Sequence, residues 1–461
     1  MAKQIITKNL RTKVLLLAMI FSAASIHAQN WTNMFNGKNL EGWEIKQGSA
    51  EYKVDGNEII GYSKLGTESS YLCTKKSYGD FILEVDVKIE VGLNSGIQFR
   101  SNSHVNGEVY GYQAEIDASD RKWSGGIFDQ SRRGWVYPVT MNEPGREAFK
   151  NGAWNSYRIE AIGNTIRTWI NGVQVANLVD DMTAEGFVAF QIHKIKNKKQ
   201  EGLKIRWRGA RILTENVENE RWPVVVQATE ISYLKNELTL NETRKGWRLL
   251  WDGKTTNGWK GAKLSDFPAS GWEMKDGILS VLESGGGEAR NGGDIVTRDR
   301  FENFELELEF RITPGANSGI KYFVDTALNK GEGSSIGCEF QILDDKLHPD
   351  AKKGVHGNRT VGSLYDLITA NSYSEPNNEK RPVSPEKWYK ARIIVHDGHV
   401  EHYLNNIKVV EYDRHSQMFN ALVAYSKYSK YEGFGQAPEG RILLQDHGNT
   451  VSFRSIKIRE N

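Results

Sequence analysis

The chain has few cysteines, no strong excess of charge of either sign, and no long apolar run beyond its first residues. Cys73 and Cys338 are the only cysteines among 461 residues, which excludes a framework of several disulfides. They fall in different predicted domains, at positions that do not correspond, so we expect two unpaired, buried thiols. The 60 basic and 58 acidic residues nearly cancel, which excludes a general binder of polyanions such as nucleic acids.

The first 28 residues have the pattern of a secretory signal peptide. Four basic residues precede the apolar run 14–24, "VLLLAMIFSAA", and Ala28 stands at a suitable cleavage position. The run is too short to span a bilayer comfortably, and no cysteine that could carry a lipid anchor follows it. The sequence therefore predicts export across the inner membrane to the periplasm, without a lipid anchor and without membrane insertion after cleavage.

The remainder contains the same order of motifs twice. "NGKNLEGW" near the start corresponds to "DGKTTNGW" much later, and a strand–Asp-Gly–strand pattern follows each of them. "NSGI" is identical at 94–97 and 317–320, and "GYQAEID" corresponds to "GCEFQIL". The sequence therefore predicts a signal peptide at 1–28, a first domain at 30–214, a linker at 215–246 and a second, similar domain at 247–461.

Strand patterns dominate both copies. The segment 304–312, "FELELEFRI", alternates apolar and charged residues, which is typical of a half-buried antiparallel strand. No long segment has a helical period. Many short strands with glycine-rich turns predict an all-β fold, with one jelly-roll β-sandwich per copy. The second copy is longer, mainly through an insertion at about 344–380, for which we predict a lid or a rim.

The ordered motifs resemble the 3-keto-disaccharide hydrolase family, formerly known only as a domain of unknown function. The resemblance rests on "NSGI", "GCEFQILD" and "LQDHGNTVSFR" together with their partial counterparts in the first copy, and it extends over nearly the whole mature chain. It implies two tandem concanavalin A-like jelly rolls that act as 3-keto-glucoside 1,2-lyases or 3-keto-2-hydroxy-glucal hydratases. It also implies a sugar substrate that a separate glycoside 3-dehydrogenase has oxidised at C3.

Such a substrate defines the chemistry that the site must perform. A ketone at C3 makes the C2 proton acidic, and the oxygen on C1 can then leave by elimination. The reaction needs a base for the C2 proton, donors for the enolate oxygen and an acid for the leaving oxygen. Addition of water would give net hydrolysis. No cofactor motif is evident. A divalent metal stays an open alternative, with His348, His356, Asp344 and Asp350 as its possible ligands. The spacing of these four residues matches no standard zinc signature.

Glu339 is the first candidate for the base. The segment 336–343 predicts a strand in which Glu339 and Gln341 share the polar face. The first copy has Gln113 and Glu115 in these places, in exchanged order, which moves the carboxylate by roughly 6–7 Å. Glu115 is therefore the candidate base of a first site that could differ in substrate or could only bind.

Histidines near the end of each copy are candidates for the acid. His447 follows Gln445 and His193 follows Gln191 at matching places, and a histidine can hold and release a proton near neutral pH. The other predicted sugar ligands, besides Gln341 and Gln113, are Asn317, Asp344, Lys353, Tyr365 and Gln445 in the second copy and Asn94, Asp117, Arg132, Arg133 and Trp135 in the first.

Each candidate also has a structural alternative. Glu339 could be a surface residue paired with a basic side chain, the asparagines could shape turns, and the arginines could form a cationic surface loop. For the protein as a whole, the alternative is a non-catalytic carbohydrate-binding module of the same fold. Hydrolysis by two carboxylates is less favoured, because each strand face offers only one acid.

Overall fold

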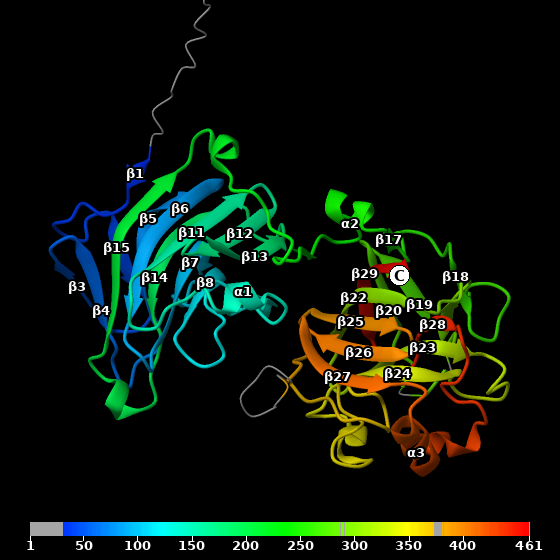
Figure 1. Ribbon diagram of the computed structural model, residues 1–461. Helices are drawn as coiled ribbons and strands as arrows, with labels where there is room; N and C mark the ends of the chain where they lie inside the picture. The colour runs from blue at the N-terminus through cyan, green and yellow to red at the C-terminus, as the bar shows by residue number, and fades with distance from the viewer. Residues whose placement is uncertain (1–30, 286, 290, 373–379, 381, 461) are drawn as a thin grey trace, which may run out of the picture. The chain divides into compact units, whose positions relative to one another are not determined.

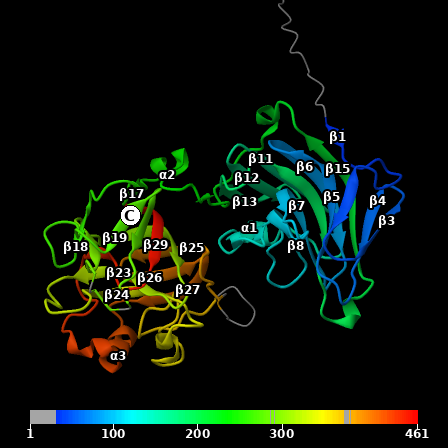
Figure 2. The ribbon, with the colours of Figure 1, turned by 180° about the vertical axis from the view of Figure 1, so that it is seen from behind.

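The computed structural model describes residues 31–460, except 286, 290, 373–379 and 381. Strands dominate these residues and form two β-sandwiches, seen from opposite sides in Figures 1 and 2. The prediction of an all-β chain with two sandwiches is confirmed. The predicted signal peptide lies outside the described residues. In the part of the chain that is described, we find no helix with the length and apolar character needed to cross a membrane.

The first sandwich has sheets of nine and seven strands. The order of the larger sheet is β16 (Ile231–Ser232), β13 (Val173–Val179), β12 (Thr165–Ile170), β11 (Asn155–Ile162), β6 (Phe81–Ile89), β15 (Lys204–Leu213), β4 (Glu58–Tyr62) and β3 (Glu51–Asp55), with β1 (Thr32–Asn33) beside β15. The order of the smaller sheet is β10 (Gly134–Tyr137), β9 (Ile127–Gln130), β8 (Val109–Asp117), β7 (Asn94–Ser103), β14 (Gly186–Ile192), β5 (Ser70–Tyr78) and β2 (Trp43–Lys46).

The second sandwich has sheets of eight and five strands. The order of the larger sheet is β19 (Trp272–Lys275), β20 (Ile278–Val281), β29 (Val451–Glu460), β22 (Phe304–Ile312), β25 (Tyr389–His396), β26 (His399–Leu404) and β27 (Ile407–Asp413), with β17 (Arg248–Leu249) beside β29. The order of the smaller sheet is β18 (Trp259–Gly261), β21 (Ile295–Thr297), β28 (Arg441–Leu444), β23 (Asn317–Asp325) and β24 (Ile336–Leu343).

Helices are short and lie in the connections. They are α1 (Glu143–Arg146), α2 (Leu240–Arg244) and α3 (Gln417–Tyr425), with single 3₁₀ turns at η1 (Lys198–Gln200), η2 (Val217–Glu220), η3 (Pro349–Lys352) and η4 (Lys427–Lys430). The segment predicted as a linker, 215–246, is not featureless. It contributes β16, which pairs in parallel with β13, and α2, whose start is fixed by a capping box between Thr239 and Glu242.

Apolar side chains of alternate strand positions form the core of each sandwich. In the second sandwich, Phe340 and Ile342 of β24 and Ile320 and Tyr322 of β23 belong to one large buried cluster. Because side chains alternate along a strand, the residues between them point to the opposite face of the five-stranded sheet. Cys73 and Cys338 are buried and free, as predicted.

The charged positions of β22 are less exposed than the sequence pattern predicts. Glu305 and Glu309 are each only 2% exposed, although they alternate with apolar residues as in a half-buried strand. In the register of β22 and β29, Glu305 stands opposite Arg459 and Glu309 opposite Arg454, and both pairs form ion pairs. Arginines on the neighbouring strand thus replace water as the partners of these carboxylates.

Candidate active site

The strand β24 holds Glu339 and Gln341 on the sheet face that points away from the core. In the register with β23, Lys321 lies opposite Glu339, and Gly319 lies opposite Gln341. Gly319 leaves the space that the carboxylate occupies, since a Cβ at that position would be 2.1 Å from Glu339 Oε1. The identical glycine of the two "NSGI" motifs therefore has a steric role beneath a polar side chain.

This face opens into a cavity of about 200 Å³. It brings together these predicted site residues: Asn317, Glu339, Gln341, Lys353, Tyr365, Gln445 and His447. Its wall is completed by Glu288, Lys321, His348, Asp350 and Lys427. His348, Asp350, Lys353 and Tyr365 come from the second-copy insertion, which forms part of the cavity wall.

Glu339 lies almost entirely out of contact with solvent, at 4% exposure. Burial raises the pKa of Glu339, and the positive charges of Lys321 and Lys427 oppose this shift. Lys321 Nζ is 3.8 Å from Glu339 Oε2. With its amide nitrogen toward the carboxylate, Gln341 donates to Ser318 O at 2.9 Å and to Glu339 Oε1 at 3.2 Å. The carboxylate is thus oriented by an amide and has a cation beside it.

Lys321 is held in place by groups on its other side. Its ammonium donates to Ser334 Oγ and to Ser335 O, the latter at 3.2 Å. Ser334 Oγ in turn donates to the buried carboxylate of Asp294. Asp294 also accepts from Asp446 N at 3.0 Å. The lysine is therefore fixed between two carboxylates, Glu339 and Asp294, and is only 4% exposed.

Two histidines lie close together in the cavity wall. The ring centroids of His348 and His447 are 6.0 Å apart, with ring planes at 86°. His348 Nδ1 accepts from Asp350 N at 3.2 Å, and burial, followed by the effect of His447, lowers the pKa of His348. His447 Nδ1 is buried and has no hydrogen-bond partner among the described residues. Nδ1 of His447 is thus a buried polar atom left unsatisfied in a residue of the cavity wall.

Tyr365 connects Asp350 and Lys427 in the cavity wall. The hydroxyl of Tyr365 donates to Asp350 Oδ2 at 2.7 Å, and Arg359 Nη1 contacts Asp350 Oδ1 at 3.1 Å. Lys427 Nζ lies 4.2 Å from the centroid of the Tyr365 ring. Desolvation lowers the pKa of Lys427, and the negative charge of Glu339 opposes the shift. This arrangement adds a further cation whose charge acts on Glu339.

The binding role predicted for Asp344 is not supported. Its side chain is 1% exposed, and both oxygens accept from backbone nitrogens: Oδ2 from Gly315 at 2.9 Å and Oδ1 from Lys346 at 3.1 Å. Asp344 therefore stabilises turns at the end of β24 and leaves no oxygen for a sugar. It is also absent from the residues that line the cavity.

The corresponding face of the first sandwich has a different arrangement. Glu115 Oε1 accepts from Asn94 Nδ2 at 2.7 Å, and Oε2 accepts from Gln113 Nε2 at 2.9 Å. Arg121 Nη2 lies 3.5 Å from Oε1. Burial raises the pKa of Glu115, and Arg121 opposes this shift. Gln98 stands at the place of Lys321, opposite Gln113. The first copy thus has a carboxylate already engaged by the protein's own donors.

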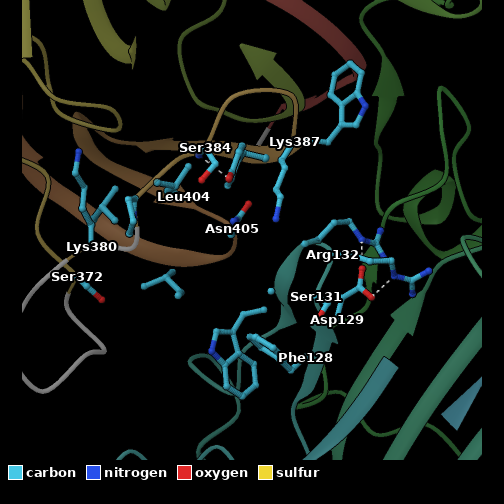
Figure 3. A pocket seen from close by; sticks show the side chains of 18 residues that line it. Phe128, Asp129, Ser131, Arg132, Ser372, Lys380, Ser384, Lys387, Leu404 and Asn405 are labelled. Carbon is cyan, nitrogen blue, oxygen red and sulfur yellow. Dashed lines mark hydrogen bonds and ion pairs between the residues drawn. The ribbon is translucent and has the colours of Figure 1, made fainter. Parts of the chain in front are cut away.

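The remaining first-copy candidates mostly have structural partners. Trp135 is 4% exposed and packs against Trp123 and Phe128, so neither face is free for a sugar ring, contrary to the prediction. Arg132 and Arg133 each pair with Asp129 at 2.6 Å, and Figure 3 shows Arg132 directed at that carboxylate. The predicted clamp is therefore an internal ion-pair cluster.

Two further candidates of the first copy also bond to nearby groups. Asp117 accepts from Ser119 N at 3.0 Å and from Arg121 Nε at 2.9 Å, which stabilises the turn after β8. His193 Nδ1 lies 2.8 Å from Lys194 O and so carries its proton there. Burial lowers the pKa of His193. Gln191, which corresponds to Gln445, donates to the hydroxyl of Tyr71 at 3.1 Å.

Three charged residues of the cavity were missed by the sequence analysis. Lys321 had a signal: it lies four residues after Asn317 and two after Gly319, so the period of a strand places all three on one face. Glu288 lies in an irregular connection and Lys427 begins the 3₁₀ turn η4, and both lie outside the recognised motifs. No pattern in the sequence assigns these two to the same cavity.

A known domain family matches both halves of the chain. The profile of the 3-keto-alpha-glucoside-1,2-lyase-like domain matches residues 30–213 and 246–459. A 3-keto-disaccharide hydrolase from Bacteroides thetaiotaomicron is 37% identical over 244 residues, which cover 49% of this chain and 81% of the relative.

Solved structures resemble parts of the chain. A protein proposed to be a glycosyl hydrolase, from Parabacteroides distasonis, is 27% identical with a TM-score of 0.43, and the match covers 49% of this chain and 99% of that one. A β-glucanase from Bacillus licheniformis is 12% identical with a TM-score of 0.29, over 41% of this chain and 98% of that one. On the evidence of the profile match, the chain belongs to the family of 3-keto-alpha-glucoside-1,2-lyase-like domains, of which it carries two in tandem.

Proposed function

We propose that the second sandwich cleaves 3-keto-glycosides by removing the C2 proton and eliminating the substituent on C1. The family and the 3-keto-disaccharide hydrolase relative support an enzyme that acts on glycosides. The observation that carries the proposal is the content of a single cavity. Its lining includes the buried carboxylate of Glu339, the ammonium groups of Lys321 and Lys427, and two histidines. In this proposal they serve as the base, the oxyanion donors and the acid that the reaction needs.

In the first step, Glu339 accepts the C2 proton. The electron pair of the broken C–H bond moves toward C3, and the carbonyl oxygen becomes an enolate oxygen. Lys321 and Lys427, whose charges act on Glu339, would stabilise this oxygen, since a fixed donor stabilises an oxyanion more than mobile water does. The raised pKa of Glu339 makes its carboxylate a stronger base than an exposed glutamate.

In the second step, the enolate re-forms the carbonyl and the bond between C1 and the glycosidic oxygen breaks. A double bond forms between C1 and C2, and His447 gives a proton to the leaving oxygen. Water that adds at C1, with a proton returning to C2, then yields the 3-keto sugar. The unsaturated sugar formed by elimination is the product of a lyase. The 3-keto sugar formed after addition of water is the product of a net hydrolysis.

Product analysis in heavy water tests this proposal. With 3-keto-trehalose as substrate, we expect deuterium at C2 of the 3-keto-glucose that forms when water adds to the elimination product. If the reaction stops after elimination, we expect the unsaturated product instead. The Glu339→Gln variant and 3-keto-glucose without enzyme serve as controls for spontaneous exchange. Cleavage without either signature contradicts the elimination, and binding of the sugar without turnover indicates the carbohydrate-binding alternative.

A further inference from the structure

A second, larger cavity shares the side chain of Glu288 with the cavity of Glu339. Its volume is about 750 Å³, against about 200 Å³ for the smaller one. Small-molecule sites commonly measure about 300–1,000 Å³. The larger cavity is thus in the range for a ligand of its own, whereas the smaller one suits only a part of a disaccharide.

Three irregular segments of the second sandwich form the larger cavity. They are the turn with Lys263 and Leu264 after β18, the segment with Glu288, Gly293 and Asp294 before β21, and the loop with Gly331 and Gly333 between β23 and β24. Lys263 Nζ donates to the carbonyl oxygens of Gly331 and Gly333. These two hydrogen bonds join the first segment to the third and so stabilise this part of the cavity wall.

The wall next to Glu288 contains glycines where a side chain would intrude. At Gly333, which has φ +83°, the nearest atom to an added Cβ is Glu288 Oε2 at 3.8 Å. At Gly292, with φ +98°, a Cβ would lie 2.1 Å from Ser270 O. A side chain at Gly292 would clash with this carbonyl, and one at Gly333 would extend from a left-handed backbone position beside Glu288, which lines both cavities.

Two hydrogen-bonded links connect this cavity to the proposed catalytic groups. Glu288 Oε1 accepts from Gln445 Nε2 at 3.1 Å, and Gln445 lines the smaller cavity. Asp294 accepts from Ser334 Oγ, to which Lys321 donates from the other side. A group bound in the larger cavity would thus lie beside Glu288, which bonds directly to Gln445, and beside Asp294, which is connected to Lys321 through Ser334.

The charges of the larger cavity favour particular ligands. Glu288 and Glu332 contribute carboxylates, and the buried carboxylate of Asp294 adds negative charge in the wall. The ammonium of Lys263 is engaged by two carbonyl oxygens. A ligand with a carboxylate or phosphate would meet like charge here. A polyhydroxylated neutral group or a cationic one would find acceptors, and Leu264, which is 49% exposed, offers an apolar surface for one face of a ring.

Building on the proposed function, we infer that the larger cavity binds the leaving group of the substrate. The oxidised ring would occupy the cavity of Glu339, and the second sugar of a disaccharide, or another neutral or cationic aglycone, would extend past Glu288. The side chains around Lys263, Leu264 and Glu332 would then determine which glycosides are cleaved.

The test compares a large and a small leaving group in a variant that fills the cavity. Leu264→Trp should lower kcat/KM for 3-keto-trehalose by about 10-fold or more, the range for disturbed pocket contacts, while methyl 3-keto-glucoside changes by less than about twofold. Met274→Trp is the matched control, since Met274 is an exposed apolar residue of β19 that lines neither cavity, and it should affect neither substrate.

The outcomes separate this inference from the proposed function. If the wild type cleaves both substrates and Leu264→Trp affects them equally, or affects neither, the leaving group does not bind in the larger cavity. A second blocking variant, Leu264→Arg, tests whether the effect is peculiar to tryptophan. It must also lower kcat/KM for 3-keto-trehalose and leave methyl 3-keto-glucoside nearly unaffected. If the wild type cleaves neither substrate, the proposed function itself fails, and this inference with it.

Discussion

At the scale of single residues, both copies have a buried carboxylate at the corresponding strand. The hydrogen-bond partners of that carboxylate distinguish the two copies. Burial raises the pKa of both Glu339 and Glu115. Glu115 accepts a short hydrogen bond on each oxygen, at 2.7 and 2.9 Å. Glu339 has one amide contact at 3.2 Å and a lysine 3.8 Å away. Only Glu339 therefore combines raised basicity with an oxygen that is free to accept a substrate proton.

Lys321 should influence the pH at which kcat/KM falls on the acidic side of the pH profile. Its positive charge lowers the pKa of Glu339 against the effect of burial, so its removal in Lys321→Met raises that pKa further. Because a base acts only when deprotonated, the acidic limb of kcat/KM should move to higher pH. Lost stabilisation of the enolate should also lower kcat at the optimum by about 10²-fold.

The measurement is a pH–rate profile of both enzymes on one substrate. Lys353→Met is the control, since Lys353 also lines the cavity but is 64% exposed and pairs with Asp350 at 3.9 Å. Its profile should keep the acidic limb in place. An unchanged limb in Lys321→Met would show that Glu339 is not the group that titrates.

At the scale of elements, the facing strands β23 and β24 show why a glycine recurs. A Cβ at Gly319 would lie 2.1 Å from Glu339 Oε1, and one at Gly96 would lie 2.2 Å from Gln113 Cδ. Gly319→Ala should therefore displace the Glu339 carboxylate and lower kcat by about 10-fold or more, since small misplacements of a catalytic group are costly.

Gly96→Ala is the matched control for this prediction. It disturbs the corresponding strand pair of the first sandwich to a similar extent, but it does not touch the cavity of Glu339. Its kcat should match that of the wild type, with circular dichroism showing that both variants are folded. Equal losses in the two variants would mean that the glycine acts through general stability of the sheet.

The strand β26 contributes a pH-dependent term to stability through His402. This side chain is fully buried: its Nε2 lies 2.7 Å from the hydroxyl of Tyr322 and its Nδ1 lies 3.0 Å from Gly362 O. Burial lowers the pKa of His402 to about 4, below the value of about 6.5 expected in the unfolded chain. The folded state therefore keeps His402 neutral in a range where the unfolded state binds a proton.

It follows that the stability due to this histidine is complete above pH 6.5 and declines as the pH falls toward 4. The free energy of unfolding of the wild type should decrease by up to about 3 kcal/mol more than that of His402→Gln between pH 7 and pH 4. Urea unfolding at several pH values measures this. Parallel curves for the two proteins would show that His402 does not contribute.

At the scale of the whole molecule, repetition made much of the fold predictable. The repeated motifs and the two-residue period indicated two sandwiches and placed Glu339 and Gln341 on one face. The period cannot report which side chains acquire internal partners, because those depend on segments far apart in sequence. Asp344 and Trp135 were misjudged for this reason, and Lys427 was missed because its neighbours in the cavity are brought together only by the fold.

The two copies should also differ in activity, and paired substitutions can show this in the intact chain. Glu339→Gln keeps the size of the side chain but removes the base, so turnover should fall by at least about 10²-fold. Glu115→Gln removes the corresponding acid of the first copy, where Asn94, Gln113 and Arg121 already engage the carboxylate. Its turnover should stay within about twofold of the wild type, because both oxygens of Glu115 already accept hydrogen bonds from the protein.

Rates on a single 3-keto-disaccharide, with melting temperatures measured alongside, decide between the possibilities. A loss in Glu339→Gln with no loss in Glu115→Gln assigns turnover to the second sandwich. A loss in both, at unchanged melting temperature, would show that the first copy also turns over substrate and that its hydrogen bonds to Glu115 rearrange when a sugar binds. Near-normal activity in Glu339→Gln would instead remove Glu339 from the mechanism. The base would then not be the carboxylate beside Lys321, because the register of β23 and β24 places only Glu339 opposite that lysine.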